Sequence, residues 1–128
     1  MDPKIVRVAV QGGMIKFLLD LRSAVVNQTT LDLSVAKEAI INVAQGIAKM
    51  LIGTNPNLIR DVEKLDVIPV LVKTLLGDEC HHGLLQFEGL LSLTNLASSE
   101  DVRSNIVTHG GWSNALAIVT SHDKNKNE

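Results

Sequence analysis

Residues 78–82, which read DECHH, form the densest group of side chains that could do chemistry. A thiolate and two imidazoles can bind zinc, but adjacent residues rarely all reach one ion, and no second Cys or His pair stands at the spacing of a structural site. Cys80 as a nucleophile would also need an orienting partner and a pocket. We expect a solvated loop here, with at most adventitious metal at Cys80, His81 and His82, and no enzyme.

Two glycine pairs, at residues 12–13 and 110–111, precede predicted helices, as phosphate-binding loops do. Neither pair is followed by the Lys-Ser or Lys-Thr of a nucleotide-binding loop, and neither follows a predicted strand. Glycines at helix starts explain both pairs without a ligand. The sequence therefore predicts no cofactor.

Polar residues recur along one side of two long apolar segments. Glu88, Ser92 and Asn95 lie at i, i+4 and i+7, which places them in one narrow stripe if the segment is helical. The earlier segment carries a similar stripe at helical spacing: Glu38, Asn42, Gln45 and Lys49. What these two stripes can bind depends on the architecture that carries them.

Helical periodicity defines the elements of the chain. The two long segments are residues 34–52 and 83–98, which are apolar over most of their circumference and should therefore be buried on several sides. Five shorter helices are predicted besides them: 14–21, 57–64, 67–76, 100–108 and one that starts at Trp112.

Turn chemistry predicts where the shorter helices begin. Asn55, directly before a proline, indicates an N-cap, and Ser98, three residues before an acid, has the spacing of a capping box. Asp66 is expected to cap the helix at 67–76, which leaves Pro69 in the tolerant first turn.

The order of short helix, loop and long helix repeats along the chain. Met14 and Val67 are 53 positions apart, as are Asn42 and Asn95, whereas Val67 to Trp112 is 45. A period of roughly 40 to 47 residues with three helices per unit is typical of armadillo repeats. We expect an all-α, right-handed armadillo-type α-solenoid of about two and a half repeats. Its parts are 11–65, 66–109, the start of a third repeat at 110–121 and a polar C-terminal tail at 122–128.

Composition excludes several classes of function. The 128 residues are 45% hydrophobic, enough for a core, and the net charge of -2 without a basic run argues against nucleic-acid binding. One cysteine forms no internal disulfide, and neither a secretory signal nor a membrane-spanning stretch is apparent. A cytoplasmic protein without a membrane partner is therefore expected.

Three stretches carry a resemblance to a known family. QFEGLLSLTNLA (86–97), VQGG (10–13) and AKMLIGTNP (48–56) resemble the UCS-domain myosin chaperones, in the same order over Val8 to Val119. The resemblance implies an armadillo solenoid that binds the myosin motor domain noncovalently and helps it fold or stay folded. It also implies that the chain is a piece of a longer protein, whose other parts could bind a general chaperone. The exposed ends of such a piece favour self-association.

The resemblance also suggests a role for the two polar stripes. In armadillo proteins the third helix of each repeat lines the concave face, and asparagines there can bond an extended peptide. It implies seven groove-lining residues: Glu38, Asn42, Gln45, Lys49, Glu88, Ser92 and Asn95. The alternative for Asn95 is a buried amide that bridges neighbouring loops. The alternative function is a scaffold or transport adaptor, although the tryptophan of importer-type grooves is replaced by Glu38 and Leu91.

Overall fold

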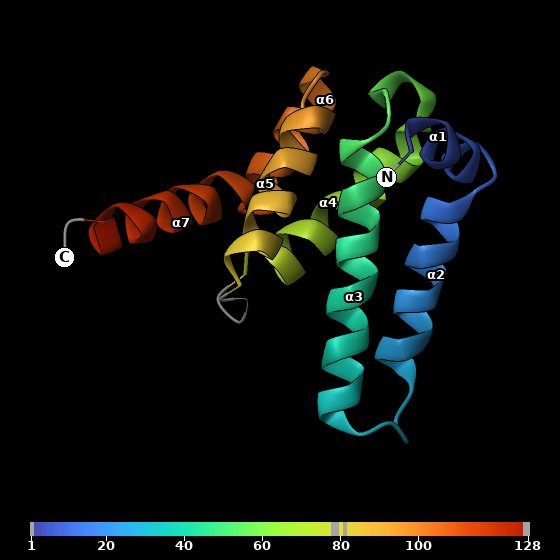
Figure 1. Ribbon diagram of the computed structural model, residues 1–128, viewed down its shortest axis with the longest axis horizontal. Coiled ribbons are helices and arrows are strands. Elements are labelled where there is room, and N and C mark those ends of the chain that lie inside the picture. Colours follow the sequence, from blue (N-terminus) through green and yellow to red (C-terminus); the bar gives the residue numbers. More distant parts are fainter. Residues whose placement is uncertain (1, 78–79, 81, 127–128) are drawn as a thin grey trace.

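The computed structural model describes residues 2–77, 80 and 82–126, with side chains up to residue 118 (Figure 1). Within these residues the chain is all-helical and contains no strand. The elements are α1 (Pro3–Gln11), α2 (Met14–Asn27), α3 (Leu33–Ile52), the 3-10 turn η1 (Pro56–Leu58), α4 (Asp61–Leu75), α5 (Gly83–Leu96), α6 (Glu100–Thr108) and α7 (Gly111–Lys126).

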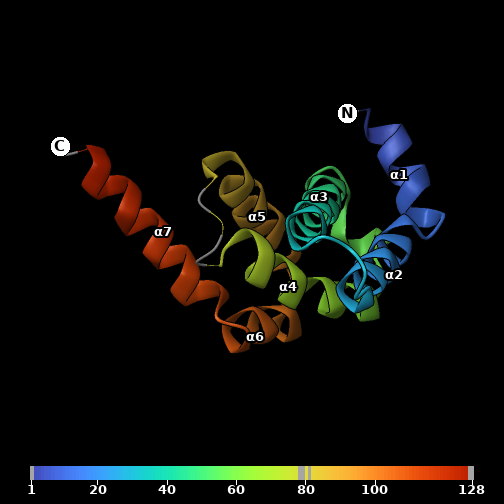
Figure 2. The ribbon, with the colours of Figure 1, turned by 90° about the horizontal axis from the view of Figure 1, so that it is seen from below.

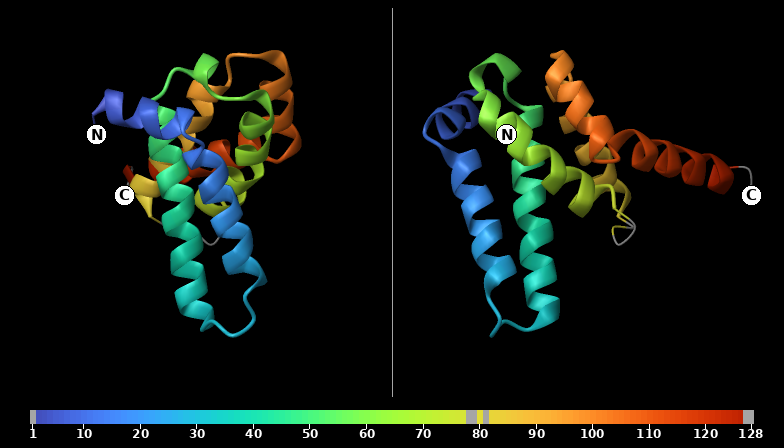
Figure 3. Two further views of the ribbon diagram at one scale, coloured as in Figure 1. Left: turned by 90° about the vertical axis from the view of Figure 1, so that its right-hand side faces the viewer. Right: turned by 180° about the vertical axis from the view of Figure 1, so that it is seen from behind.

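The helices stack side by side. α2 and α3 form a hairpin whose closed end projects beyond the other helices, and α5 lies along the opposite side of α3 (Figure 1). α4 packs on both α3 and α5 and lies between this pair and α6 (Figure 2). α7 contacts α6 and extends away from the rest of the molecule (Figure 3).

The core is aliphatic and lies where α3, α4 and α5 meet. Its large, fully buried side chains include Ile15, Ile47, Leu51, Ile68, Leu71, Leu75 and Leu96. All three aromatic side chains of the sequence are exposed instead: Phe17, Phe87 and Trp112. Burial of branched aliphatic side chains therefore supplies the packing, and the aromatic surface remains available to solvent or to a partner.

α3 and α5 bury the same helical positions at a constant offset. α3 buries Val43, Ala44, Ile47, Ala48 and Leu51, and α5 buries Glu88, Gly89, Ser92, Leu93 and Leu96, each 45 residues later. The register of 53 residues predicted from Asn42 and Asn95 is therefore wrong for the packed faces. The prediction aligned the two helices on their asparagines because the residue type is the same. The positions that pack in the core are instead equivalent by their place around the helix.

The long helices and α6 begin and end within two residues of their predicted bounds. Asp32 caps α3 by accepting a hydrogen bond from the Ser34 main-chain N–H at 2.8 Å. Ser99, not Ser98, caps α6 and accepts from the Val102 N–H at 3.3 Å. Gly13 and Gly110 precede α2 and α7 with φ of 89° and 81°, in the left-handed region that favours glycine.

One continuous helix replaces the two predicted at 57–64 and 67–76. Only the short η1 turn follows Asn55, and α4 then runs unbroken from Asp61, so Asp66 lies inside the helix and caps nothing. Pro69 lies in the helix interior, not in the first turn. The helix continues through the proline because residues on both sides of it are buried against α3 and α5, and tertiary packing outweighs one missing donor.

Three further differences lie in the outer helices. α1 was not predicted, although Asp2 stands directly before a proline, as Asn55 does, and caps α1 by accepting a hydrogen bond from the Lys4 N–H. α2 continues beyond the predicted end at 21 as far as Asn27. α7 continues through most of the predicted polar tail to Lys126, and the last two residues lie outside the described part of the chain.

Candidate functional site

The polar stripe on α5 faces α3. The Gln45 side-chain amide donates to Glu88 Oε1 at 2.9 Å, and the Ser92 hydroxyl donates to the Gly89 carbonyl at 2.8 Å. Glu88 is 8% exposed and Ser92 is 0% exposed. Neither residue lines an open groove, which corrects the prediction for both. Both side chains tolerate burial because they are hydrogen-bonded, Glu88 to Gln45 of α3 and Ser92 to a carbonyl of α5 itself.

Asn95 forms hydrogen bonds with the C-terminal end of α3 and the turn that follows it. Its Nδ2 donates to the Leu51 carbonyl at 2.6 Å and to the Thr54 carbonyl at 3.1 Å. Leu51 belongs to the last turn of α3, where carbonyl groups lack partners within the helix. Asn95 therefore satisfies the C-terminal end of α3, as in the alternative expectation of a bridging amide, and its amide N–H groups are not free to bind a peptide.

The polar stripe on α3 lies differently. Glu38, Asn42 and Lys49 are exposed, and only Gln45 turns toward α5. The structure therefore brings Gln45 and Glu88 together but leaves Asn42 and Asn95 in unlike surroundings. Asn42, Lys49 and Glu38 remain available to a ligand, and the two stripes do not form one repeated ladder.

The exposed side of α5 is apolar. Leu84, Phe87 and Leu91 lie at i, i+3 and i+7 and are all exposed, Phe87 by 60%. We call these three residues the α5 apolar row. None of them was among the predicted site residues, although Phe87 stands in the stretch that carries the family resemblance. The signal that would have found them is a row of large apolar residues directly beside the polar stripe, since Phe87 and Leu91 immediately precede Glu88 and Ser92 in the sequence.

A cavity of about 410 Å³ adjoins this row at the C-terminal end of α5. Thr94, one turn after Leu91, lines it together with Val107 and Trp112 from the next two helices. Trp112 and Val107 are largely exposed. The apolar row and this cavity are two apolar surfaces of the kind that marks protein interaction sites.

The four residues of the QFEG stretch each have a different role in the structure. The Gln86 amide donates to the Cys80 carbonyl at 2.8 Å and so ties the preceding loop to α5. Phe87 faces outward and Glu88 bonds Gln45. Gly89 allows α4 to approach closely, because a Cβ there would lie 3.0 Å from Leu75 Cβ.

The loop before α5 holds the residues considered for metal binding and nucleophilic chemistry, and the structure describes it only in part. Cys80 is buried and His82 is exposed, while His81 lies outside the described residues. In the described part of the chain, no three His, Cys, Asp or Glu side chains come together as a metal site. The adventitious metal site suggested for this loop therefore stays an expectation about a segment that is only partly described.

Known proteins offer no guide to this geometry. No family model, no curated protein and no solved structure matches the chain. Among the described helices, none combines the length and the apolar character that crossing a membrane requires. Function must therefore be inferred from the contacts, exposure and charges of the chain's own residues.

Proposed function

We propose that the chain is a right-handed armadillo-type α-solenoid segment. The constant offset of 45 residues between the buried faces of α3 and α5 supports this, because it falls within the roughly 40 to 47 residues of an armadillo period. The helix order then gives one unit in α1, α2 and α3, a second in η1, α4 and α5, and the start of a third in α6 and α7. This division begins each unit at the short helix or turn.

We further propose that this segment is a noncovalent protein-binding module of a myosin-directed chaperone, and that it helps the motor domain to fold or stay folded. The α5 apolar row carries the proposal, because solenoid repeats bind through one open face and this face is apolar. A partly folded motor domain would present apolar segments that such a face can cover. The myosin client itself rests on the resemblance of the QFEG stretch.

Two exposed phenylalanines make a matched test. Phe87 on the α5 row is 60% exposed, and Phe17 on α2 is 59% exposed, so their truncation to alanine removes the same side chain from equally open positions. Phe87→Ala should weaken binding of the chain to a myosin motor domain at least about tenfold, as truncation of an aromatic anchor does, and Phe17→Ala should leave it nearly unchanged. Biolayer interferometry measures both.

Two results contradict the proposal at different points. If the unmodified chain neither binds the motor domain nor suppresses its heat aggregation, myosin is not the client. If Phe17→Ala and Phe87→Ala weaken binding equally, the α5 apolar row is not the binding surface.

A scaffold or transport adaptor that binds an extended peptide is the second candidate. Asn42 favours it, because its amide is exposed on α3 and could bond a peptide main chain. Asn95 disfavours it, because its amide is committed to Leu51 and Thr54. A peptide held along several repeats needs the amide at each repeat, so the chaperone module is the better supported proposal.

A further inference from the structure

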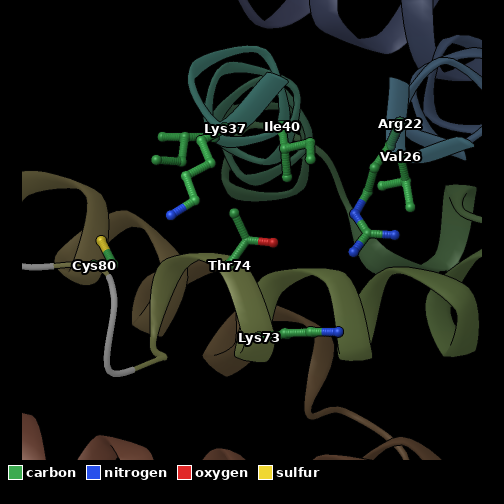
Figure 4. A pocket seen from close by; sticks show the side chains of 8 residues that line it. Arg22, Val26, Lys37, Ile40, Lys73, Thr74 and Cys80 are labelled. Atoms are coloured by element: carbon green, nitrogen blue, oxygen red, sulfur yellow. The ribbon is translucent and has the colours of Figure 1, made fainter. Parts of the chain in front are cut away.

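A second cavity, of about 570 Å³, lies between the α2–α3 hairpin and α4. Figure 4 shows Arg22 pointing from α2 toward α4, Lys37 extending from α3, and Lys73 lying along α4. Val26, Ile40 and Ile41 form an aliphatic wall. Its volume is within the range of ligand-binding cavities, about 300 to 1,000 Å³.

The three cations lack anionic partners within the described residues. None of the ion pairs there includes Arg22, Lys37 or Lys73. Asp20 and Asp66 line an adjoining cavity together with Arg22 and Lys73, yet neither carboxylate pairs with them. A chain with a net charge of -2 therefore gathers three unpaired positive side chains around one cavity.

Arg22 provides a second observation, a buried donor at the cavity. Its Nε is fully buried and has no hydrogen-bond acceptor. A buried donor without an acceptor costs free energy, and most such groups in folded proteins are satisfied by protein, water or an ion. A carboxylate in the cavity could accept from the guanidinium of Arg22, and the positive charge of Lys37 on the cavity wall would favour it.

We propose that this cavity binds an acidic side chain of a protein partner that is flanked by aliphatic residues. The carboxylate would lie between Arg22 and Lys37, and the flanking side chain would pack on Val26 and Ile40. Nucleic acid fits less well, because no aromatic side chain lines the cavity for base stacking and the chain has no basic run. The inference rests on the proposed function in one respect only, that the partner is a protein.

The probe is a fluorescein-labelled nonapeptide that alternates glutamate and leucine, compared with the same peptide carrying glutamine for glutamate. Fluorescence anisotropy should show binding of the glutamate peptide and at least about tenfold weaker binding of the glutamine peptide. Arg22→Gln and Lys37→Gln should each weaken binding of the glutamate peptide by about tenfold. Arg7→Gln, an exposed change on α1, should leave it unchanged. Lys37 is also exposed, so its variant keeps the test valid if Arg22→Gln disturbs folding.

Several outcomes overturn the inference. The inference is wrong if both peptides bind equally or if the glutamate peptide does not bind. It is also wrong if Arg7→Gln weakens binding of the glutamate peptide as much as Arg22→Gln does. Binding of inorganic phosphate or anionic vesicles without binding of the peptide would overturn it too. The two proposals fail separately. If the glutamate peptide binds through Arg22 but the motor domain does not bind, only the myosin client is wrong. If the motor domain binds through Phe87 but the peptide does not bind, only the cavity inference is wrong.

Discussion

α3 and α5 bury equivalent helical positions, yet they differ in the polar side chains that they bury and in the apolar ones that they expose. α3 buries aliphatic residues and exposes polar ones such as Asn42 and Lys49. α5 buries Glu88 and Ser92 and exposes the apolar row. Hydrogen bonds from Glu88 and Asn95 therefore join α5 to α3, and the apolar row beside them stays exposed. The proposed protein-binding surface rests on this difference between the two helices.

The comparison also separates two readings of a polar stripe on a helix. On α3 the stripe is solvated except at Gln45, whereas on α5 Glu88 and Asn95 of the stripe bond α3 and the turn after it. A polar stripe on an otherwise apolar helix thus marks the groove only if its side chains lack internal partners. The following substitutions test whether α5 is packed in this inverted way.

The largest effect is expected at the one large leucine that α5 buries completely. Leu96→Ala should lower the free energy of unfolding by about 2–5 kcal/mol, because it opens a cavity in the core. Leu91→Ala, on the α5 apolar row, should change it by less than about 1 kcal/mol. Urea denaturation followed by circular dichroism measures both. Equal losses would show that the row is packed and not open.

Two glycines, Gly89 on α5 and Gly46 on α3, test the close approach of α4 to α5. In Gly89→Ala the new Cβ meets Leu75 Cβ at 3.0 Å, and overpacking should cost about 1–3 kcal/mol. In Gly46→Ala on α3 the nearest atom is Leu18 Cδ1 at 3.7 Å, an ordinary contact. That variant should be as stable as the unmodified chain or gain up to about 1 kcal/mol from helix propensity. A stabilised Gly89→Ala would contradict the packing of α5 on α4.

The Gln45–Glu88 hydrogen bond gives a direct measure of coupling between the two stripes. A double-mutant cycle with Gln45→Ala and Glu88→Ala should yield a coupling free energy of about 0.5–1.5 kcal/mol. The same cycle with Asn42→Ala in place of Gln45→Ala should yield almost none, because Asn42 is exposed and does not bond Glu88. Additive effects of Gln45 and Glu88 would mean that the stripes do not touch.

The smallest expected effect on stability concerns the N-terminal caps of α3 and α5. Hydrogen bonds from the Ser34 side chain and main chain hold the pKa of Asp32 below its ordinary value, whereas His82 makes no capping bond at the start of α5. A lowered pKa in the folded chain means that the stability Asp32 contributes is complete above its ordinary pKa. That contribution is lost as pH falls through the folded value.

Urea titrations at neutral pH and at about pH 3 check this prediction. Asp32→Ala should reduce stability slightly at neutral pH, and Asp32→Asn should keep the cap while removing its pH dependence. His82→Ala should change little at either pH. If Asp32→Ala were neutral at both pH values, the cap would contribute nothing.

Much of the helical content could be predicted from the sequence, because periodicity and caps are local signals. α3, α5 and α6 begin and end close to their predicted bounds. The continuity of α4 through Pro69 could not be predicted, since it depends on burial against helices far along the chain. The missed α1 is different, because Asp2 and the proline after it are a local signal that was present.

The direction of the α5 stripe was also beyond sequence reasoning. α5 is apolar over most of its circumference, so the helical period alone does not decide which side faces α3. The cavity cations come from three helices and are separated by 15 and 36 residues, which leaves no motif to find. Only the packing of α2, α3 and α4 brings Arg22, Lys37 and Lys73 together.

The two asparagines test the central claim most directly, because they are the same residue in the two compared helices. Asn95→Ala should lower the free energy of unfolding by about 1–3 kcal/mol, since it leaves the Leu51 and Thr54 carbonyls without their side-chain donor. Asn42→Ala should lower it by less than about 0.5 kcal/mol, since Asn42 is exposed. If both variants lost equally little free energy of unfolding in urea denaturation, the account would be contradicted, because Asn95 would then face an open groove instead of bonding α3.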